Sequence, residues 1–217
     1  MKTRLYLIRH GESLGNMERR FLGHTDLDLS ELGYIQADMT AKALADVHFD
    51  YIYSSDLIRA YNTALPHAKQ RGMEINTSKE LREIYVGKWE GKTVDKILED
   101  YEDLFINGWR RNFGLTTPPE GEAVLAGGCR FKKELEKIAK EHEGKVLLIA
   151  SHAAVIRSFW SIILGLEPHE FAEGLHFAGN ASFSIIDFEN GKFTPIEYSN
   201  SEHLGELATY VDDRIKQ

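Results

Sequence analysis

The sequence predicts an α/β fold in which a mostly parallel central sheet has an antiparallel edge. Short apolar runs typical of buried parallel strands alternate with segments whose apolar residues recur at helical spacing, and the strongest run is 146–150. Asn190-Gly191 separates the last two strand-like segments and is a common hairpin turn. Strands that alternate with helices indicate a mostly parallel sheet, and a closing hairpin adds an antiparallel edge.

The N-terminal half is expected to contain three strands and two helices. The first strand, 5–8, is a run of apolar residues that ends abruptly at Arg9-His10-Gly11. A polar loop follows over 16–29, and Ser30 has the side chain of a helix cap. The elements expected next are an amphipathic helix from Ser30 to about Asp46, a strand at 51–53, a helix from near Leu57 that Ser54-Ser55-Asp56 can cap and Pro66 can bend, and a strand around Ile75.

The C-terminal half is expected to begin with an excursion that covers the sheet as a lid, over roughly 84–127. This segment is rich in Gly and aromatic residues, contains Pro118-Pro119, and has in Thr93 a candidate cap for a helix to about Phe105. The elements expected after it are an amphipathic helix over 131–142, the strand 146–150, an apolar helix over 154–164, and strands over 182–188 and 193–198.

Composition indicates a soluble globular chain. Its 217 residues suit one sizeable domain or one domain with an inserted cap, and 42% hydrophobic and 28% charged residues are ordinary values. A net charge of −8 argues against nucleic acid or an anionic membrane as a partner. No run approaches the roughly 20 apolar residues of a membrane span. The single Cys129 allows no internal disulfide, so we expect a cytoplasmic protein, with its oligomeric state left open.

Basic side chains lie close to the ends of three expected strands. Arg9-His10 follow the first strand, Arg59 lies in the first turn of the helix after the second, and His152 follows the strongest. Because the carboxyl ends of parallel strands meet at one edge of a sheet, we expect these two Arg and two His to share a pocket. In an otherwise acidic protein such a pocket indicates a dianionic ligand, and guanidinium groups match the oxygens of phosphate.

Two imidazoles beside a phosphate predict phosphoryl transfer. A neutral imidazole is able to attack phosphorus and to hold the phosphoryl group covalently until water removes it. The second imidazole and the guanidinium groups stabilise the transferring group, and a carboxyl group protonates the departing alkoxide. This scheme uses neither a metal ion nor a cofactor, so we expect none.

Five motifs, taken in order, resemble the histidine phosphatase superfamily, phosphoglycerate-mutase-like branch. They are Leu7-Ile8-Arg9-His10-Gly11-Glu12-Ser13 with Asn16, Ser54-Ser55-Asp56-Leu57-Ile58-Arg59-Ala60 with Thr63, Leu81-Arg82-Glu83, Gly87-Lys88-Trp89-Glu90-Gly91, and Ile149-Ala150-Ser151-His152. The resemblance spans most of the chain. It implies a single domain over 1–217 and a three-layer α/β sandwich, with helices on both faces of the sheet and the lid at roughly 84–127.

The resemblance also implies roles for the residues that match these motifs. His10 is the residue expected to be phosphorylated at a ring nitrogen, and Glu83 is the expected proton donor. One departure is visible, since Ala153 follows the second His where members of the family often have Gly. The binding residues implied are Arg9, Arg59, His152 and Asn16 for the phosphoryl group, and Gly23, His24 and Thr25 for the substrate-side loop.

Phosphatases and mutases of this family share the pocket, so the two activities have to be distinguished from the lid. The Gly87-Lys88-Trp89-Glu90-Gly91 segment resembles the phosphatases, as does the short distance from Pro119 to the next helix. Against this, Arg110 and Arg111 resemble the paired arginines with which mutases hold a second anionic group of the substrate. We expect a phosphomonoester hydrolase acting on a small phosphorylated metabolite, with a cofactor-dependent phosphoglycerate mutase as the alternative.

Two further hypotheses belong to other classes. Gly91-Lys92-Thr93 resembles the end of a nucleotide-binding loop, but Gly87 and Gly91 enclose three residues where that loop needs four. A catalytically silent relative that only binds a phosphorylated ligand is disfavoured, because the positions of nucleophile, acid and phosphate clamp are all filled.

Overall fold

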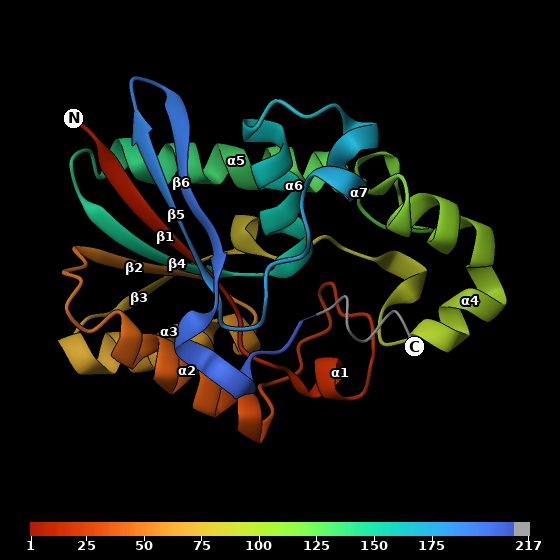
Figure 1. The fold of residues 1–217 in the computed structure, drawn as a ribbon, viewed down its shortest axis with the longest axis horizontal. Coiled ribbons are helices and arrows are strands. Elements are labelled where there is room, and N and C mark those ends of the chain that lie inside the picture. Colours follow the sequence, from red (N-terminus) through yellow and green to blue (C-terminus); the bar gives the residue numbers. More distant parts are fainter. Residues whose placement is uncertain (211–217) are drawn as a thin grey trace.

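Six strands form one mixed sheet in the computed structural model, which describes residues 1–210 (Figure 1). The strands, in chain order, are β1 (Thr3–Arg9), β2 (Tyr51–Ser55), β3 (Ile75–Ser78), β4 (Val146–Ser151), β5 (Phe183–Glu189) and β6 (Lys192–Asn200). Their order across the sheet is β3-β2-β4-β1-β5-β6. The first four are parallel, whereas β5 and β6 pair antiparallel, so the predicted sheet is confirmed. Residues 211–217 of the predicted domain lie outside the described part.

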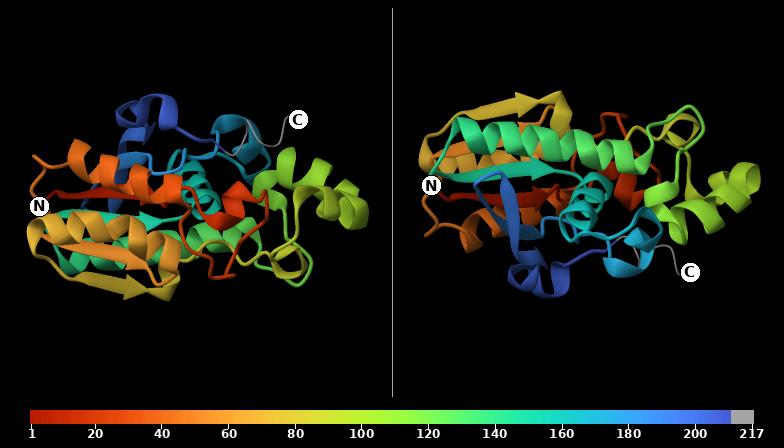
Figure 2. Two further views of the ribbon diagram at one scale, coloured as in Figure 1. Left: turned by 90° about the horizontal axis from the view of Figure 1, so that it is seen from below. Right: turned by 90° about the horizontal axis from the view of Figure 1, so that it is seen from above.

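Helices cover both faces of the sheet, which also confirms the predicted layers. One face carries α2 (Glu31–Ala43) and α3 (Ile58–Arg71), and the other carries α5 (Val124–Glu141) and α6 (Ala153–Ile163), as the opposite views of Figure 2 show. Within residues 1–210, no helix is both long and apolar enough to cross a membrane.

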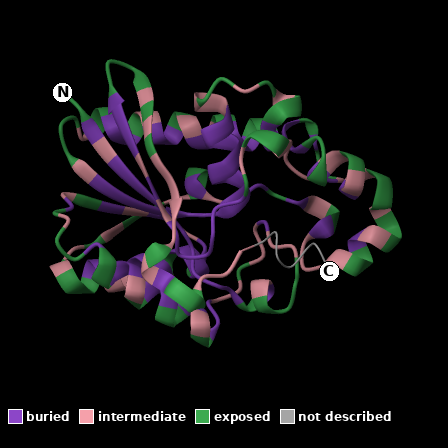
Figure 3. Ribbon diagram, in the orientation of Figure 1, coloured by how far each residue is buried: buried purple, intermediate pink, exposed green. Residues whose placement is uncertain are grey.

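The central strands bury both of their faces, which explains their unbroken apolar sequences. In β1, Leu5 and Leu7 pack into the core under α5 and α6, whereas Tyr6 and Ile8 pack into the core under α2 and α3. Successive side chains point to opposite faces of a strand, so a strand between two layers of helices is apolar at every position. Figure 3 shows this burial along the middle of the sheet.

The segment between β3 and α5 leaves the sheet and lies at the right of Figure 1. It contains α4 (Val94–Asp103), which Thr93 caps as predicted, and then a π-helical turn, Leu104–Arg110, instead of a simple helix end near Phe105. Trp89 is fully buried in this segment and packs edge-to-face against Phe21, Phe105 and Trp109. The aromatic residues noted in the sequence therefore form the interior of the excursion.

Helix α5 begins at Val124, seven residues before the start predicted at 131. Gly127 and Gly128 made this stretch resemble a loop. A Cβ atom on Gly128 would lie 2.2 Å from the Ser158 hydroxyl of α6, so glycine is needed there for the close contact of two helices. The prediction was wrong because close packing and chain reversal both favour glycine, and the sequence does not distinguish them.

Two local details near the first strands also differ from expectation. A short helix α1 (Leu14–Met17) occupies the start of the predicted loop, where Ser13 and Asn16 form a reciprocal capping box. At the start of α3, the predicted Ser54-Ser55-Asp56 cap is not formed, because Leu57 occupies the N-cap position and has no side-chain cap bond. The Ser55 hydroxyl accepts the Leu57 N–H just before the helix, and the Asp26 carboxylate of another loop accepts the Ile58 N–H. Pro66 lies inside α3, and the helix continues through it.

Candidate active site

A cavity of about 100 Å³ lies at the carboxyl ends of β1 and β4. Five residues singled out in the sequence line it, namely Arg9, His10, Asn16, Arg59 and Glu83. The fold therefore brings together side chains from three separate motifs, as expected for the edge where parallel strands end. The rest of the lining is largely apolar and includes Phe21, Leu22, Val86, Trp109 and Phe177.

His10 is buried at the end of β1 and is held in one tautomer. Its Nδ1 lies 2.7 Å from the carbonyl oxygen of Gly11, which cannot donate, so Nδ1 carries the proton and Nε2 keeps its lone pair. Burial and the nearby charges of Arg59 and Arg9 lower the pKa of His10 well below its usual value. The imidazole is therefore neutral at neutral pH, which is the state a nucleophile requires.

His152 lies beside His10 at the end of the neighbouring strand. The two ring centroids are 5.2 Å apart, and Arg9 is paired in the sheet with Ser151, the residue before His152. His152 is fully buried, and within the described residues neither of its ring nitrogens has a hydrogen-bond partner. Burial and the charge of Arg59 lower its pKa as well. His152 itself does not line the cavity, so the pocket expected to hold both imidazoles is lined by His10 with the His152 ring beside it.

Two guanidinium groups of the cavity, those of Arg9 and Arg59, are buried and oriented by backbone carbonyls. Arg9 Nη1 donates to the Ala178 carbonyl at 2.6 Å, and Arg59 donates from Nη1 to Thr25 and from Nη2 to Gly23 at 2.9 and 2.8 Å. Burial lowers the pKa of Arg59 to about 10, so it remains charged at neutral pH. Because buried cations are costly unless paired, these two groups favour an anionic ligand.

Glu83 is bound to the first turn of α6. Its Oε1 accepts the N–H groups of Ile84 and Val155 at 2.9 and 2.8 Å, and its Oε2 accepts that of Ala154 at 2.9 Å. Burial raises the pKa of Glu83, although these N–H groups and the charge of Arg59 act in the opposite direction. A carboxyl group with a raised pKa is suited to donate a proton.

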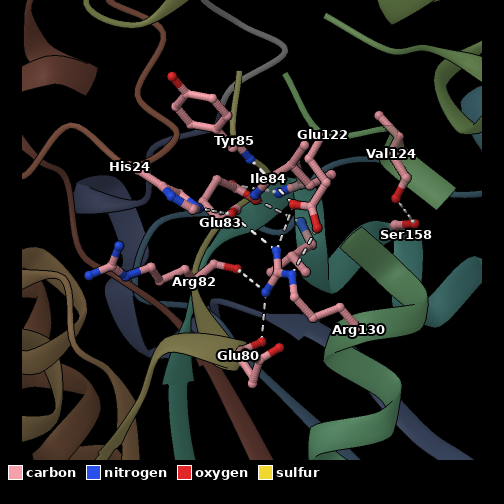
Figure 4. A network of polar contacts seen from close by, with 12 residues as sticks. His24, Glu80, Arg82, Glu83, Ile84, Tyr85, Glu122, Val124, Arg130 and Ser158 are labelled. Carbon is pink, nitrogen blue, oxygen red and sulfur yellow. Dashed lines mark hydrogen bonds and ion pairs between the residues drawn. The ribbon is translucent and has the colours of Figure 1, made fainter. Parts of the chain in front are cut away.

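The backbone of Glu83 is fixed by two further side chains, shown in Figure 4. Arg130 of α5 donates to the carbonyls of Glu80 and Glu83 at 2.7 and 3.3 Å and forms an ion pair with Glu122 at 2.8 Å. The ring of His24 contacts the same Glu83 carbonyl through Nε2 at 2.9 Å. The sequence did not indicate Arg130, because nothing local distinguishes it from the other basic residues of an amphipathic helix.

The loop residues Gly23, His24 and Thr25 do not line the cavity. Gly23 and Thr25 contact Arg59 through their carbonyl groups instead. The Glu90 carboxylate accepts the N–H groups of all three, at 3.2, 2.8 and 3.0 Å, and the Thr25 hydroxyl at 2.6 Å. In the sequence Glu90 is visible only as part of the motif Gly87-Lys88-Trp89-Glu90-Gly91, which gives no sign of these contacts.

Asn16 lines the cavity with its amide already oriented. Its Oδ1 accepts the Ser13 N–H at 3.2 Å and the Asn180 side chain at 3.1 Å, so the group left for a ligand is its Nδ2 donor. Arg110 and Arg111 are exposed and are not part of the lining. Arg110 stacks over the ring of Phe105 at 5.2 Å, and Arg111 donates to the side chain of Asn107 at 3.0 Å.

Comparison with known proteins shows the family of the chain. The family model of the histidine phosphatase superfamily (branch 1) matches residues 5–201. The chain belongs to this superfamily. The resemblance noted in the sequence is thereby confirmed, and the site described above is that of a histidine phosphatase superfamily member whose second imidazole is followed by Ala153.

Members similar to this chain include phosphatases and a mutase. Phosphoserine phosphatase 1 of Hydrogenobacter thermophilus is 33% identical over 210 residues, which are 97% of each chain. The probable phosphoglycerate mutase GpmB of Yersinia pestis is 32% identical over 85% of each chain. Among solved structures, the mycobacterial glucosyl-3-phosphoglycerate phosphatase superposes with a TM-score of 0.83 at 26% identity, covering 93% of this chain and all of the other.

Proposed function

We propose that the protein is a phosphomonoester hydrolase that works through a phosphohistidine formed on His10. The observation that carries the proposal is the pair of His10 and Arg59 in one cavity. A neutral imidazole with its Nε2 lone pair available lies with a buried, charged guanidinium in a pocket that also contains a carboxyl group of raised pKa. These features support the roles of nucleophile, anion clamp and proton donor that the proposal assigns to them.

The proposed reaction has two steps. His10 Nε2 attacks phosphorus, the bond from phosphorus to the ester oxygen breaks, and the Glu83 carboxyl proton goes to that oxygen, which releases the alcohol. Water then attacks the phosphohistidine, Glu83 accepts a proton from it, and the bond from phosphorus to Nε2 breaks to give inorganic phosphate. Arg9 and Arg59 stabilise the oxygens that carry the charge in both transition states, and His152 beside His10 is proposed to assist them.

A small phosphorylated metabolite is the substrate class that fits best. The similar phosphatases named above act on phosphoserine and on glucosyl-3-phosphoglycerate, as their names state. The cavity of about 100 Å³ has room for a phosphoryl group and a short organic part, which would rest against Phe21, Trp109 and Phe177. We also propose that the reaction needs no metal ion, since the two guanidinium groups already supply the positive charge.

A phosphoglycerate mutase is the second candidate, and the similarity to GpmB favours it. A mutase has to hold a substrate that carries a second anionic group. Arg110 and Arg111 lie outside the cavity. Besides Arg9 and Arg59, the lining contains the guanidinium of Arg20, which already contacts Glu18 and the Gly91 carbonyl. This arrangement favours the hydrolase.

The decisive experiment is to trap the covalent intermediate. The protein is mixed with ³²P-labelled phenyl phosphate in EDTA-containing buffer and quenched in alkali, where phosphohistidine survives, whereas acid destroys it. We expect label on the wild type and on His169→Gln, an exposed control, and none on His10→Ala. An unlabelled wild type that also releases no phosphate would favour the silent relative. Isomerisation of 3-phosphoglycerate that is primed by 2,3-bisphosphoglycerate and outruns phosphate release would favour the mutase.

A further inference from the structure

The carboxylate of Glu90 gathers four donors from one short loop. Backbone N–H groups of Gly23, His24 and Thr25 and the hydroxyl of Thr25 all point to it, at 2.6 to 3.2 Å. Burial acts to raise the pKa of Glu90, but these donors outweigh it and the pKa is lowered. The donors of the loop therefore stabilise the ionised form of the Glu90 carboxylate.

The same loop supplies both carbonyl groups that orient Arg59. In a planar trans peptide the C=O and N–H groups point in opposite directions. The Gly23 carbonyl and the His24 N–H belong to one peptide unit, so the 2.8 Å bond from His24 N–H to Glu90 directs the Gly23 carbonyl away from Glu90. That carbonyl accepts Arg59 Nη2 at 2.8 Å on the other side. One rigid peptide thus links the carboxylate to the guanidinium.

Gly23 permits this close approach. A Cβ atom on Gly23 would lie 2.4 Å from Glu90 Oε1 and 2.6 Å from the Ile84 carbonyl, which is closer than real Cβ contacts. A side chain there would push the carboxylate off the loop, so a glycine at 23 and a carboxylate at 90 form one interlocking unit.

Glu90 belongs to the excursion between β3 and α5. It follows the short 3₁₀ helix Gly87–Trp89, and Trp89 is fully buried among Phe21, Phe105 and Trp109. Two of these aromatic residues, Phe21 and Trp109, also line the cavity. A displacement of this aromatic cluster would therefore move Glu90 together with the loop it holds.

We propose that Glu90 is a positioning residue that sets the location of the Arg59 guanidinium through the 23–25 loop and couples the lid to the phosphoryl site. The proposal rests on the proposed function, because it assigns to Arg59 the phosphoryl group as its ligand. Glu90 does not line the cavity and is not a catalytic residue. Its effect on phosphate binding reaches the cavity through Arg59.

The test is a double-mutant cycle read by anion binding. Kd for inorganic phosphate is measured calorimetrically, without turnover, for wild type, Glu90→Gln, Arg59→Lys and the double variant. Glu120→Gln serves as a control, since Glu120 lies in the same excursion and forms only an exposed pair with Lys88. We expect Glu90→Gln to weaken phosphate binding and kcat/KM about tenfold each, because a misplaced clamp has effects of that size.

In the Arg59→Lys background, the same Glu90→Gln change is expected to alter phosphate affinity less than about twofold, because residues that act through one another are not additive. Equal effects in both backgrounds would overturn the proposal, as would a Glu90→Gln variant with lowered thermal stability and unchanged phosphate affinity. Phosphate binding needs no turnover, so a wild type that binds phosphate yet forms no phosphohistidine would contradict the proposed function and leave this test valid.

Discussion

Glu83 Oε1 accepts the backbone N–H of Val155 at 2.8 Å, which binds the candidate proton donor to the helix that begins directly after His152. The candidate acid Glu83 and the second imidazole, His152, are thus both fixed to the start of α6. The helix N-terminus favours the ionised carboxylate, whereas burial disfavours it, and the raised pKa shows that burial dominates. Burial is therefore the main reason why the pKa of the candidate proton donor, Glu83, is raised.

A bell-shaped pH profile follows from these two groups. Activity requires neutral His10, whose pKa is lowered, and protonated Glu83, whose pKa is raised. We expect kcat/KM to fall as pH drops through the pKa of His10 and also as pH rises through that of Glu83. Glu83→Gln should lose about 10²- to 10⁴-fold in kcat and lose the alkaline limb, because its amide does not titrate. Initial rates across pH check this, and an alkaline limb retained in Glu83→Gln would contradict the assignment.

Stability should fall on acidification because His67 is buried in its neutral form. Burial lowers the pKa of His67 to about 3, whereas the unfolded chain titrates near 6.5. Between these values the unfolded state binds more protons, so the free energy of unfolding decreases as pH falls, by about 1.4 kcal/mol per pH unit. Both ring nitrogens lack hydrogen-bond partners in the described chain, so His67→Leu breaks no such bond.

Urea unfolding at pH 7 and pH 5 measures this effect. We expect His67→Leu to reduce the loss of stability between these pH values by about 2 kcal/mol relative to wild type. His10 and His152 have lowered pKa values too and keep part of the dependence. The exposed His169→Gln should behave as wild type. A dependence unchanged in His67→Leu would show that this imidazole is not buried neutral.

Removal of Arg130 should affect both stability and turnover. Arg130→Gln takes away donors to the Glu80 and Glu83 carbonyls and the partner of Glu122, which costs about 1–3 kcal/mol for the polar groups left unpaired. We expect kcat to fall more than KM rises, because the acid is displaced while the phosphate clamp is not. Lys133→Gln, an exposed change on the same helix, is the control for chemical denaturation and steady-state kinetics.

Arg110→Ala and Arg111→Ala should leave KM for phosphoserine and 3-phosphoglycerate within about twofold of wild type. Both side chains are exposed and lie outside the cavity lining, and surface contacts of this kind contribute little. Arg59→Ala, tested beside them, should raise KM strongly for every phosphomonoester. If Arg110→Ala or Arg111→Ala selectively raised KM for a substrate with a second anionic group, the mutase hypothesis would gain the support that the cavity does not provide.

The parts of the site that the sequence predicted are those that depend on local pattern. His10 and His152 follow buried strands directly, and topology alone places such residues at one edge. Glu90 and Arg130 act through bonds to backbone groups far away in the chain, and residue type does not encode which carbonyl or N–H they meet. Gly128 was misinterpreted for the same reason, since its contact with Ser158 exists only once α5 and α6 have packed.

The pairing of β1 with β4 has a consequence for redesign. The register of β1 and β4 places the two imidazoles side by side at the edge of the sheet. We expect segments that contact the organic part of a substrate to be exchangeable between relatives without moving these two rings. Glu90 limits such an exchange. A transplanted segment that lacks Glu90, or that meets a side chain at position 23, would displace Arg59 as well as change the selectivity.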